Sequence, residues 1–195
     1  MKNLFVDSDK TFVVSDRSSG QVMAEALIAI TITVIGLLGI FSLTSRSLSL
    51  NQTVSGQYIG SNLAMEGLEV VKNLIDRTII QHQTDPTITF GKGIDDGIYE
   101  IAYNDIALGR QISPMIDNCG PDYVRENGTE LTLDENSGLY GYGFQKNTGF
   151  KRAVCIKNIS VDGRSDKIQV NSIVAWTGRG NSRSDINLED YFFNW

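Results

Sequence analysis

Apolar and polar residues alternate differently in three parts of the chain, and each pattern predicts a different element. From Ala26 to Ser45 the chain contains no Asp, Glu, Lys or Arg. A helix needs about 20 apolar residues to cross a hydrocarbon layer of roughly 30 Å. This run therefore predicts a transmembrane helix over about residues 24–45, and Arg46 is the first charge after it.

Beyond Arg46 the apolar residues become periodic. They recur at spacings of four, three, four and four at Ala64, Leu68, Val71, Ile75 and Ile79. This is the stripe of an amphipathic helix. We therefore expect one helix from about residue 22 to residue 80, apolar all round at first and amphipathic afterwards. Gly56 and Gly60 form a pair of small residues four apart, which indicates either close approach of another helix or loose local packing.

After Pro86 the pattern changes to short segments separated by turn residues, which is typical of strands. The candidate strands are Thr87–Phe90, Gly97–Tyr103, Leu131–Asp134, Phe150–Asn158, Ile168–Thr177 and Arg183–Phe192. Residues Ile106–Asn127 read as a long loop, with a helical turn within it as an open alternative, and Gly178–Asn181 as the turn of a closing hairpin.

These patterns together predict an α+β fold in three parts. Residues 1–20 form a polar leader, residues 21–80 a stem helix, and residues 81–195 a β-rich globular head. The head is expected to be an antiparallel sheet with one face packed on the second half of the stem helix.

The junction between leader and stem carries the most specific signal. Gly20 closes the leader, and Glu25 is an acidic residue at the mouth of the apolar run. A charged side chain at the centre of a membrane span costs roughly 2.5–3.5 kcal/mol on insertion scales, so an ionisable residue inside or beside a span is a functional candidate.

The sequence Gly20-Gln21-Val22-Met23-Ala24-Glu25, with the run AEALIAITITVIGLLGIF, resembles the processing site of type IV prepilins and pseudopilins. The resemblance extends to about Asp76. It implies that a prepilin peptidase cuts after Gly20 on the cytoplasmic face and methylates the new amine of Gln21. The chain departs from the family in lacking the aromatic residue that many members carry at Gln21, and its span contains no proline.

The resemblance also gives Glu25 a role. Cleavage creates an α-amino group with a reference pKa of about 7.7–8.0. The resemblance implies that Glu25 of one subunit pairs with the amine of Gln21 on a neighbour and so sets the register of a filament. The alternative is that Glu25 lies at the headgroup level of an ordinary signal anchor.

We therefore expect a structural subunit, of the minor kind, of a type IV pilus-like filament, and not an enzyme. The implied partners are other pilin subunits, the prepilin peptidase, the inner-membrane assembly platform and, before assembly, membrane lipid. The expected location is the cytoplasmic membrane, crossed once with the head outside, and then the filament. Two alternatives stay open: a pseudopilin of a type II secretion system, and a membrane-anchored binding domain that does not polymerise.

Charge adds three expectations. The net charge is −6 and the isoelectric point is about 4.8, which argues against nucleic acid as the main partner. Lys146, Lys151 and Arg152 form a small basic group, which we expect to decorate a solvated face. Lys10 and Arg17 precede the span closely, which favours a cytoplasmic leader.

The two cysteines, Cys119 and Cys155, are expected to form a disulfide in an extracytoplasmic head, as the resemblance to pilins also implies. The bridge would close a loop of about 37 residues and contribute ~3–4 kcal/mol. The alternative is two separate buried thiols.

No cofactor or metal is expected, because two distant cysteines and the lone His82 do not make a zinc site. The segment Asp134–Gly138 resembles part of a calcium loop, but a plain turn is favoured because the twelfth position is Gln145.

Overall fold

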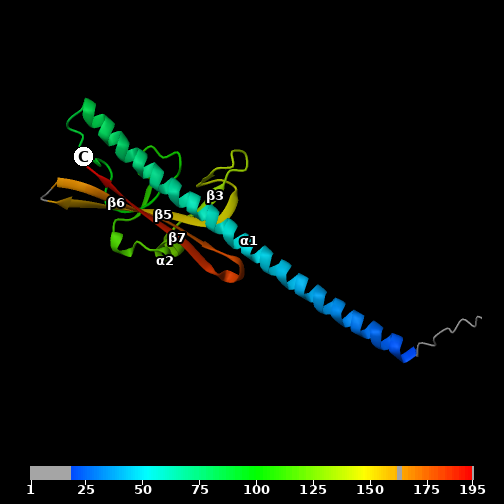
Figure 1. The fold of residues 1–195 in the computed structure, drawn as a ribbon. Coiled ribbons are helices and arrows are strands. Elements are labelled where there is room, and N and C mark those ends of the chain that lie inside the picture. The colour runs from blue at the N-terminus through cyan, green and yellow to red at the C-terminus, as the bar shows by residue number, and fades with distance from the viewer. Residues whose placement is uncertain (1–18, 162–163, 195) are drawn as a thin grey trace, which may run out of the picture. The chain divides into compact units, whose positions relative to one another are not determined.

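The computed structural model describes residues 19–161 and 164–194 (Figure 1). Most of the predicted leader, residues 1–18, lies outside this described part. The contacts divide the chain into two compact units, residues 1–48 and 49–195.

The first unit is helical throughout its described part. Helix α1 extends from Ser19 to Thr84, so the predicted helix over 22–80 is confirmed with slightly longer ends. All residues from 20 to 48 are exposed. Within them Thr31, Thr33 and Thr44 each donate a side-chain hydrogen bond to the carbonyl four residues earlier, over 2.7–2.9 Å. These bonds satisfy the hydroxyl donors without water.

The second unit combines the remaining part of α1 with a seven-stranded antiparallel sheet. The strands are β1 (Gly97–Glu100), β2 (Arg110–Ser113), β3 (Glu130–Leu133), β4 (Tyr140–Gly141), β5 (Lys146–Val161), β6 (Arg164–Thr177) and β7 (Arg183–Phe193). The long strand β5 is central. β6 and then β7 lie along one of its edges, while β1–β2 and β3–β4 share the other edge.

One face of the sheet packs against residues 49–84 of α1. The period-two register sets this face, since Phe150 pairs with Trp176 and Val154 with Ser172, so these side chains point the same way. On the helix, the buried side includes Ala64, Val71 and Ile75. The predicted packing of the last strands on the stem helix is therefore present within this unit. The apolar stripe predicted for the helix is not buried over its full length, because Ile79 at its C-terminal end is 40% exposed.

Glycines allow α1 to lie close to this face. A Cβ on Gly60 would lie 2.7 Å from Cζ3 of Trp176, and one on Gly56 would lie 3.0 Å from its Nε1. A Cβ on Gly67 would overlap the Ser172 hydroxyl. The small residues predicted to admit another helix therefore admit the chain's own sheet.

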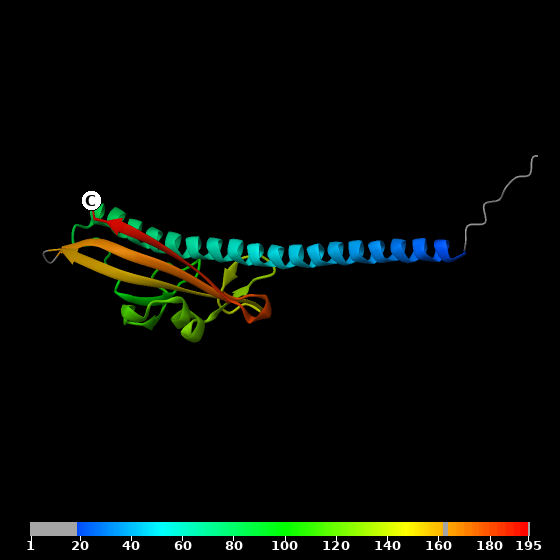
Figure 2. The same ribbon diagram turned by 60° about the horizontal axis from the view of Figure 1, so that its bottom comes forward.

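The opposite face of the sheet is covered by the segment between β1 and β3 (Figure 2). This segment holds β2, the 3-10 helix η1 (Ile116–Asn118) and helix α2 (Pro121–Asn127). Val124 of α2 is fully buried against Ala153 and Ile173 of the sheet. The prediction of a long loop over 106–127 is therefore wrong for most of this range, because a short strand, a 3-10 helix and an α-helix lie within it.

The strand predicted over Thr87–Phe90 is also wrong. Successive turns fill this segment, in which the Ile88 amide donates to the Asp85 carbonyl at 3.0 Å and the Lys92 amide to that of Thr89 at 3.1 Å. Asp85 also accepts a hydrogen bond from the Thr87 amide at 2.9 Å. Local bonding of this kind satisfies the backbone without a neighbouring strand.

Arg152 was expected to lie on a solvated basic face with Lys146 and Lys151, and this expectation is wrong. Its side chain is fully buried between α1 and the sheet. One terminal nitrogen donates to the Leu63 carbonyl and the Glu66 carboxylate, both at 2.9 Å, and the other donates to the Ile101 carbonyl at 2.5 Å. The cause is the strand period, which places residue 152 on the same face as Phe150 and Val154.

Candidate functional site

The predicted processing junction lies in the first turns of α1. Gly20 is helical, and a Cβ built on it would meet nothing within 4 Å. Gly20 is the second residue of α1, so the penalty of about 1 kcal/mol that glycine carries relative to alanine in a helix interior does not apply to it in full. At position 60 the fold requires glycine, because a side chain there would collide with Trp176. Gly20 has no such reason among the described residues, so packing within this chain does not account for it.

Glu25 lies one turn further along the same helix and is exposed. It is the only Asp, Glu, Lys or Arg between Gly20 and Ser45. Within the part of the chain that the structure describes, Glu25 makes no hydrogen bond or ion pair. Any ion-pair partner of this carboxylate would therefore lie outside the described residues.

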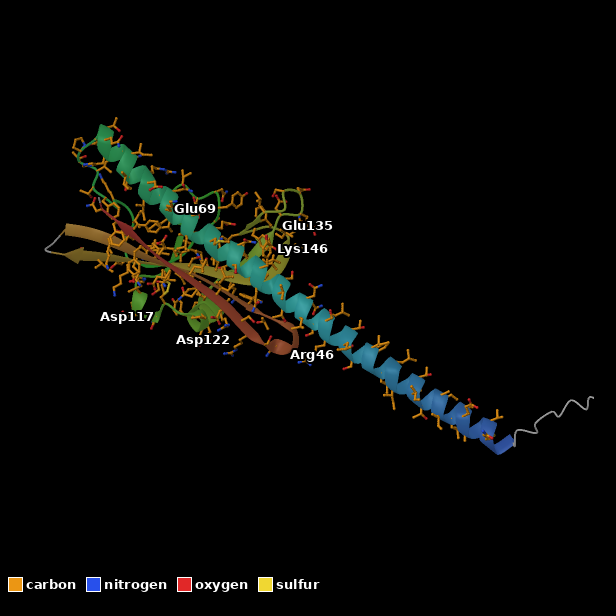
Figure 3. All side chains as sticks on the ribbon, viewed as in Figure 1. Arg46, Glu69, Asp117, Asp122, Glu135 and Lys146 are labelled. Carbon is orange, nitrogen blue, oxygen red and sulfur yellow. A yellow bond between two sulfur atoms is a disulfide. The ribbon has the colours of Figure 1, made fainter. Side chains whose placement is uncertain are left out.

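The helix around Glu25 exposes large apolar side chains on all sides (Figure 3). Val22, Leu27, Ile30, Leu38 and Phe41 are between 51% and 77% exposed. The mean hydropathy reaches 2.5 in an 18-residue window of which none is buried. A surface of this kind is poorly solvated by water, so its stable surroundings are lipid or other apolar helices. The helix is long and apolar enough to span a membrane.

Gly36 and Gly39 lie within this apolar surface. A Cβ on either would meet nothing within 4 Å. Small residues spaced along an apolar helix let a second helix approach closely. Like Gly20, these two glycines have no packing role within the described chain.

The structure contains the disulfide Cys119–Cys155, with the two Cα atoms 6.2 Å apart. This is the pairing expected for the head. Cys155 lies in β5 and is 1% exposed, while Cys119 directly follows η1. The bridge therefore fastens the η1–α2 segment to the centre of the sheet, on the face away from α1.

The remaining sequence candidates have local structural roles. The Nδ1 atom of His82 lies 2.6 Å from the Ile88 carbonyl oxygen at the end of α1. Asp134 accepts hydrogen bonds from the Asn136 amide at 3.0 Å and the Ser137 hydroxyl at 2.7 Å, which closes a turn ending at Gly138. The Ser137 hydroxyl and the Asn136 amide lower the pKa of Asp134.

The aromatic residues Tyr140 and Tyr142 pack against the core formed by α1 and the sheet. Burial raises the pKa of Tyr142 well above its ordinary value. Within the described ranges there is no group of three or more His, Cys, Asp and Glu side chains arranged for a metal ion.

The buried ion pair between Arg152 and Glu66, which lie 2.9 Å apart, was not predicted from the sequence. The signal was present in the alternation of β5, where residue 152 falls between inward-facing Phe150 and Val154. Glu100, which is 5% exposed and is paired with Arg110, was not predicted either.

Comparisons with protein-family models, with curated proteins and with solved structures find no match for this chain. The functional argument therefore depends on the junction, the apolar helix and the folded unit themselves.

Proposed function

We propose that this chain is a structural subunit of a type IV pilus-like filament, made as a precursor and cut after Gly20. The observation that carries the proposal is the junction itself. Gly20 and Glu25 occupy the spacing of a prepilin site, and neither residue has a packing partner in the described chain. The exposed apolar helix that follows supplies a surface for both stages, membrane insertion and assembly.

The proposed pairing of Glu25 with the amine of Gln21 on a neighbouring subunit follows from their opposite charges. Cleavage would leave a cationic amine at Gln21, with a reference pKa of about 7.7–8.0. An isolated carboxylate is strongly disfavoured in an apolar environment, and a bound cation offsets most of that cost. Pairing Glu25 with the amine of a neighbouring subunit would satisfy both groups and fix the axial register of the two helices.

The folded unit fits the role of a part that stays outside the membrane. It contains a disulfide, which persists mainly in oxidising compartments. Its core is continuous with residues 63–78 of α1, so the helix that would enter the filament also forms part of the folded core. A minor pilin and a secretion pseudopilin share these features, and the proposal covers the filament role common to both.

A membrane-anchored binding domain that does not polymerise is the second candidate. The observation that favours it is the exposed apolar helix, which by length and composition fits a simple single-pass anchor. That candidate needs neither cleavage after Gly20 nor a partner for Glu25.

Photo-crosslinking between copies tests the assembly role. A photoreactive amino acid replaces Phe41, which is 77% exposed, in cells that also express the chain's own assembly genes. We expect a ladder of crosslinked multimers for the wild type and its loss in Glu25→Gln. The matched control is Glu69→Gln, which removes the same charge from an exposed position in the second unit (Figure 3). An equal ladder in Glu25→Gln would contradict the proposal and favour the simple anchor.

A further inference from the structure

A hollow of about 530 Å³ opens in the second unit, beside β1 and the β3–β4 hairpin. Glu100, Tyr103, Asp105, Arg110, Tyr142 and Phe144 line it. Its size lies in the range of small-molecule sites, and its mixture of aromatic faces with a few convergent polar groups is typical of such sites. The hollow has no part in the junction or the apolar helix, so its use is independent of the proposed filament role.

Glycines shape two walls of the hollow. A Cβ on Gly109 would overlap the carbonyl oxygen of Glu100, so only glycine lets this loop come so close to β1. A Cβ on Gly141 would lie 2.8 Å from Cε2 of Phe144, so the missing side chain makes room for that ring. The Phe144 amide is held by a hydrogen bond to the Thr132 hydroxyl at 2.9 Å. This bond holds the backbone of Phe144 in the wall of the hollow.

The Arg110 charge in the lining is already paired. Its Nε donates to Oε2 of Glu100 at 2.8 Å, and its Nη2 donates to the Thr129 hydroxyl at 2.8 Å. The other oxygen of Glu100 accepts the Thr129 amide. The side chain of Glu100 is 4% exposed and that of Arg110 is 64% exposed, so the carboxylate is held in the wall while the guanidinium paired with it stays largely in contact with solvent.

Asp105 is different, because its charge is not paired with a cation in the described chain. Its Oδ2 accepts the Ala102 amide at 2.8 Å, which fixes the carboxylate's position but leaves its charge. The lining therefore contains two carboxylates and one guanidinium, a net charge of one negative. Burial is the main cause that raises the pKa of Tyr142; the charge of Arg152 lowers it, and the charges of Glu100 and Asp105 act in the direction of burial.

Aromatic faces add to this negative field. Tyr103 is 39% exposed, while Tyr142 and Phe144 are half-buried. The face of an aromatic ring attracts a cation through its quadrupole, most strongly where water is partly excluded. An anion would meet a net negative lining and an arginine already paired with Glu100. A neutral ligand could donate a hydrogen bond to the Asp105 carboxylate, but only a cation would also neutralise its charge.

We propose that this hollow binds an organic cation, an ammonium or guanidinium group carried on an apolar stem. The cationic group lies against Asp105, and the stem packs on Tyr103 and Phe144. The source is either a free small amine or a basic side chain of a partner protein, which present the same chemistry.

Titration of the full chain tests the site. The ¹⁵N-labelled chain is held in a non-ionic polyoxyethylene detergent, whose headgroup contains neither an ammonium group nor a sugar. The probes are n-butylammonium chloride and the blocked peptide acetyl-Gly-Lys-Gly-amide, compared with n-butanol, sodium butyrate and glucose. We expect saturable shifts of the Tyr103, Tyr142 and Phe144 amides with the two cationic probes only. Tighter binding of the peptide would identify a basic side chain as the source, and equal binding a small amine.

Asp105→Asn is the decisive variant, because its amide oxygen still accepts the Ala102 amide while the charge is lost. We expect cation affinity to fall at least about tenfold, since a partly buried charge partner is worth more than 1.4 kcal/mol. Tyr103→Leu should weaken binding as well. The matched control, Asp117→Asn, removes a charge from the exposed η1 and should leave affinity unchanged. Equal binding of n-butanol, or no saturable binding of either cation, would overturn the proposal.

Discussion

At the scale of single residues, Arg152 shows how a charge is accommodated in this core. Burying a charge is costly unless it is paired and hydrogen-bonded. Three acceptors from separate parts of the chain meet the guanidinium: the Leu63 carbonyl, the Glu66 carboxylate and the Ile101 carbonyl. Arg152 therefore connects α1, the sheet and the segment after β1.

Glu66→Gln should destabilise the folded unit by about 1–3 kcal/mol, because it removes the negative partner of a buried cation while keeping an acceptor oxygen. Urea unfolding of the full chain, followed by tryptophan fluorescence, measures this loss. Glu69→Gln is the control, since Glu69 is exposed on the same helix and its change should stay within about 0.5 kcal/mol. Equal effects of the two substitutions would show that the buried pair contributes nothing specific.

Gly60→Ala should also destabilise this unit, by about 1–3 kcal/mol, because its Cβ would lie 2.7 Å from the Trp176 ring and force the helix away from the sheet. This loss outweighs the gain of up to about 1 kcal/mol in helix propensity. The same unfolding measurement applies. Gly39→Ala makes the same change where space is open, so it should not lower the stability of the folded unit. A stabilised Gly60→Ala protein would contradict the close approach.

The turn at Asp134 gives a pH prediction. Hydrogen bonds from Ser137 and Asn136 lower the pKa of Asp134 in the folded chain. A lowered folded pKa means that these bonds stabilise the turn above the unfolded value of about 3.9 and are lost as the pH falls through the folded value. Carboxyl-carbon NMR titration should give a midpoint below 3.9 for Asp134, moving upward in Ser137→Ala. An unshifted midpoint in the wild type would count against the turn.

At the scale of elements, the helix and strands that could be predicted from the sequence are those in which the apolar residues keep their period over many positions. The helix and the strands around Phe150–Asn158 and Ile168–Thr177 have enough periodic positions to define a face. Thr87–Phe90 has strand-like residues but bonds locally through Asp85 instead. The β2–η1–α2 segment was missed because each of its elements is short and its apolar residues matter only once the sheet exists to receive them.

The candidate junction could be found from sequence because its signal is local, a glycine and a glutamate five residues apart beside an apolar run. The hollow beside β1 could not, because Glu100, Asp105 and Phe144 come together only through the sheet pairing and the turns between strands. The same is true of Glu66 and Arg152, which are separated by 86 residues.

The disulfide is the element-scale feature with the clearest energetic consequence. It joins residues separated by 36 positions, for which the chain-entropy model gives a stabilisation of ~3–4 kcal/mol. Cys119→Ala should lower the free energy of unfolding by about this amount. Reductant should weaken the wild type to the same extent and leave Cys119→Ala unchanged. A wild type whose stability does not respond to complete reduction would show that packing of α2 alone holds this layer.

At the scale of the whole molecule, the glycines of α1 fall into two groups, one explained by the fold and one not. Those at 56, 60 and 67 let α1 lie on its own sheet, and the fold explains them. Those at 20, 36 and 39 face open space in an exposed apolar helix. Glycines inside a helix that do not aid the fold, as at 36 and 39, are expected where something outside the chain approaches. This expectation agrees with the proposal that a peptidase acts at Gly20 and that neighbouring subunits pack on the apolar helix.

The most direct test of this account is the intact mass of the chain after expression with an active prepilin peptidase. The account predicts a mature protein that begins at N-methylated Gln21. Gly20→Ala should abolish this product, whereas Gly36→Ala, an equally unconstrained glycine of the same helix, should be processed normally. A wild-type chain that still begins at Met1 beside an active peptidase would contradict the account and leave a simple membrane anchor in its place.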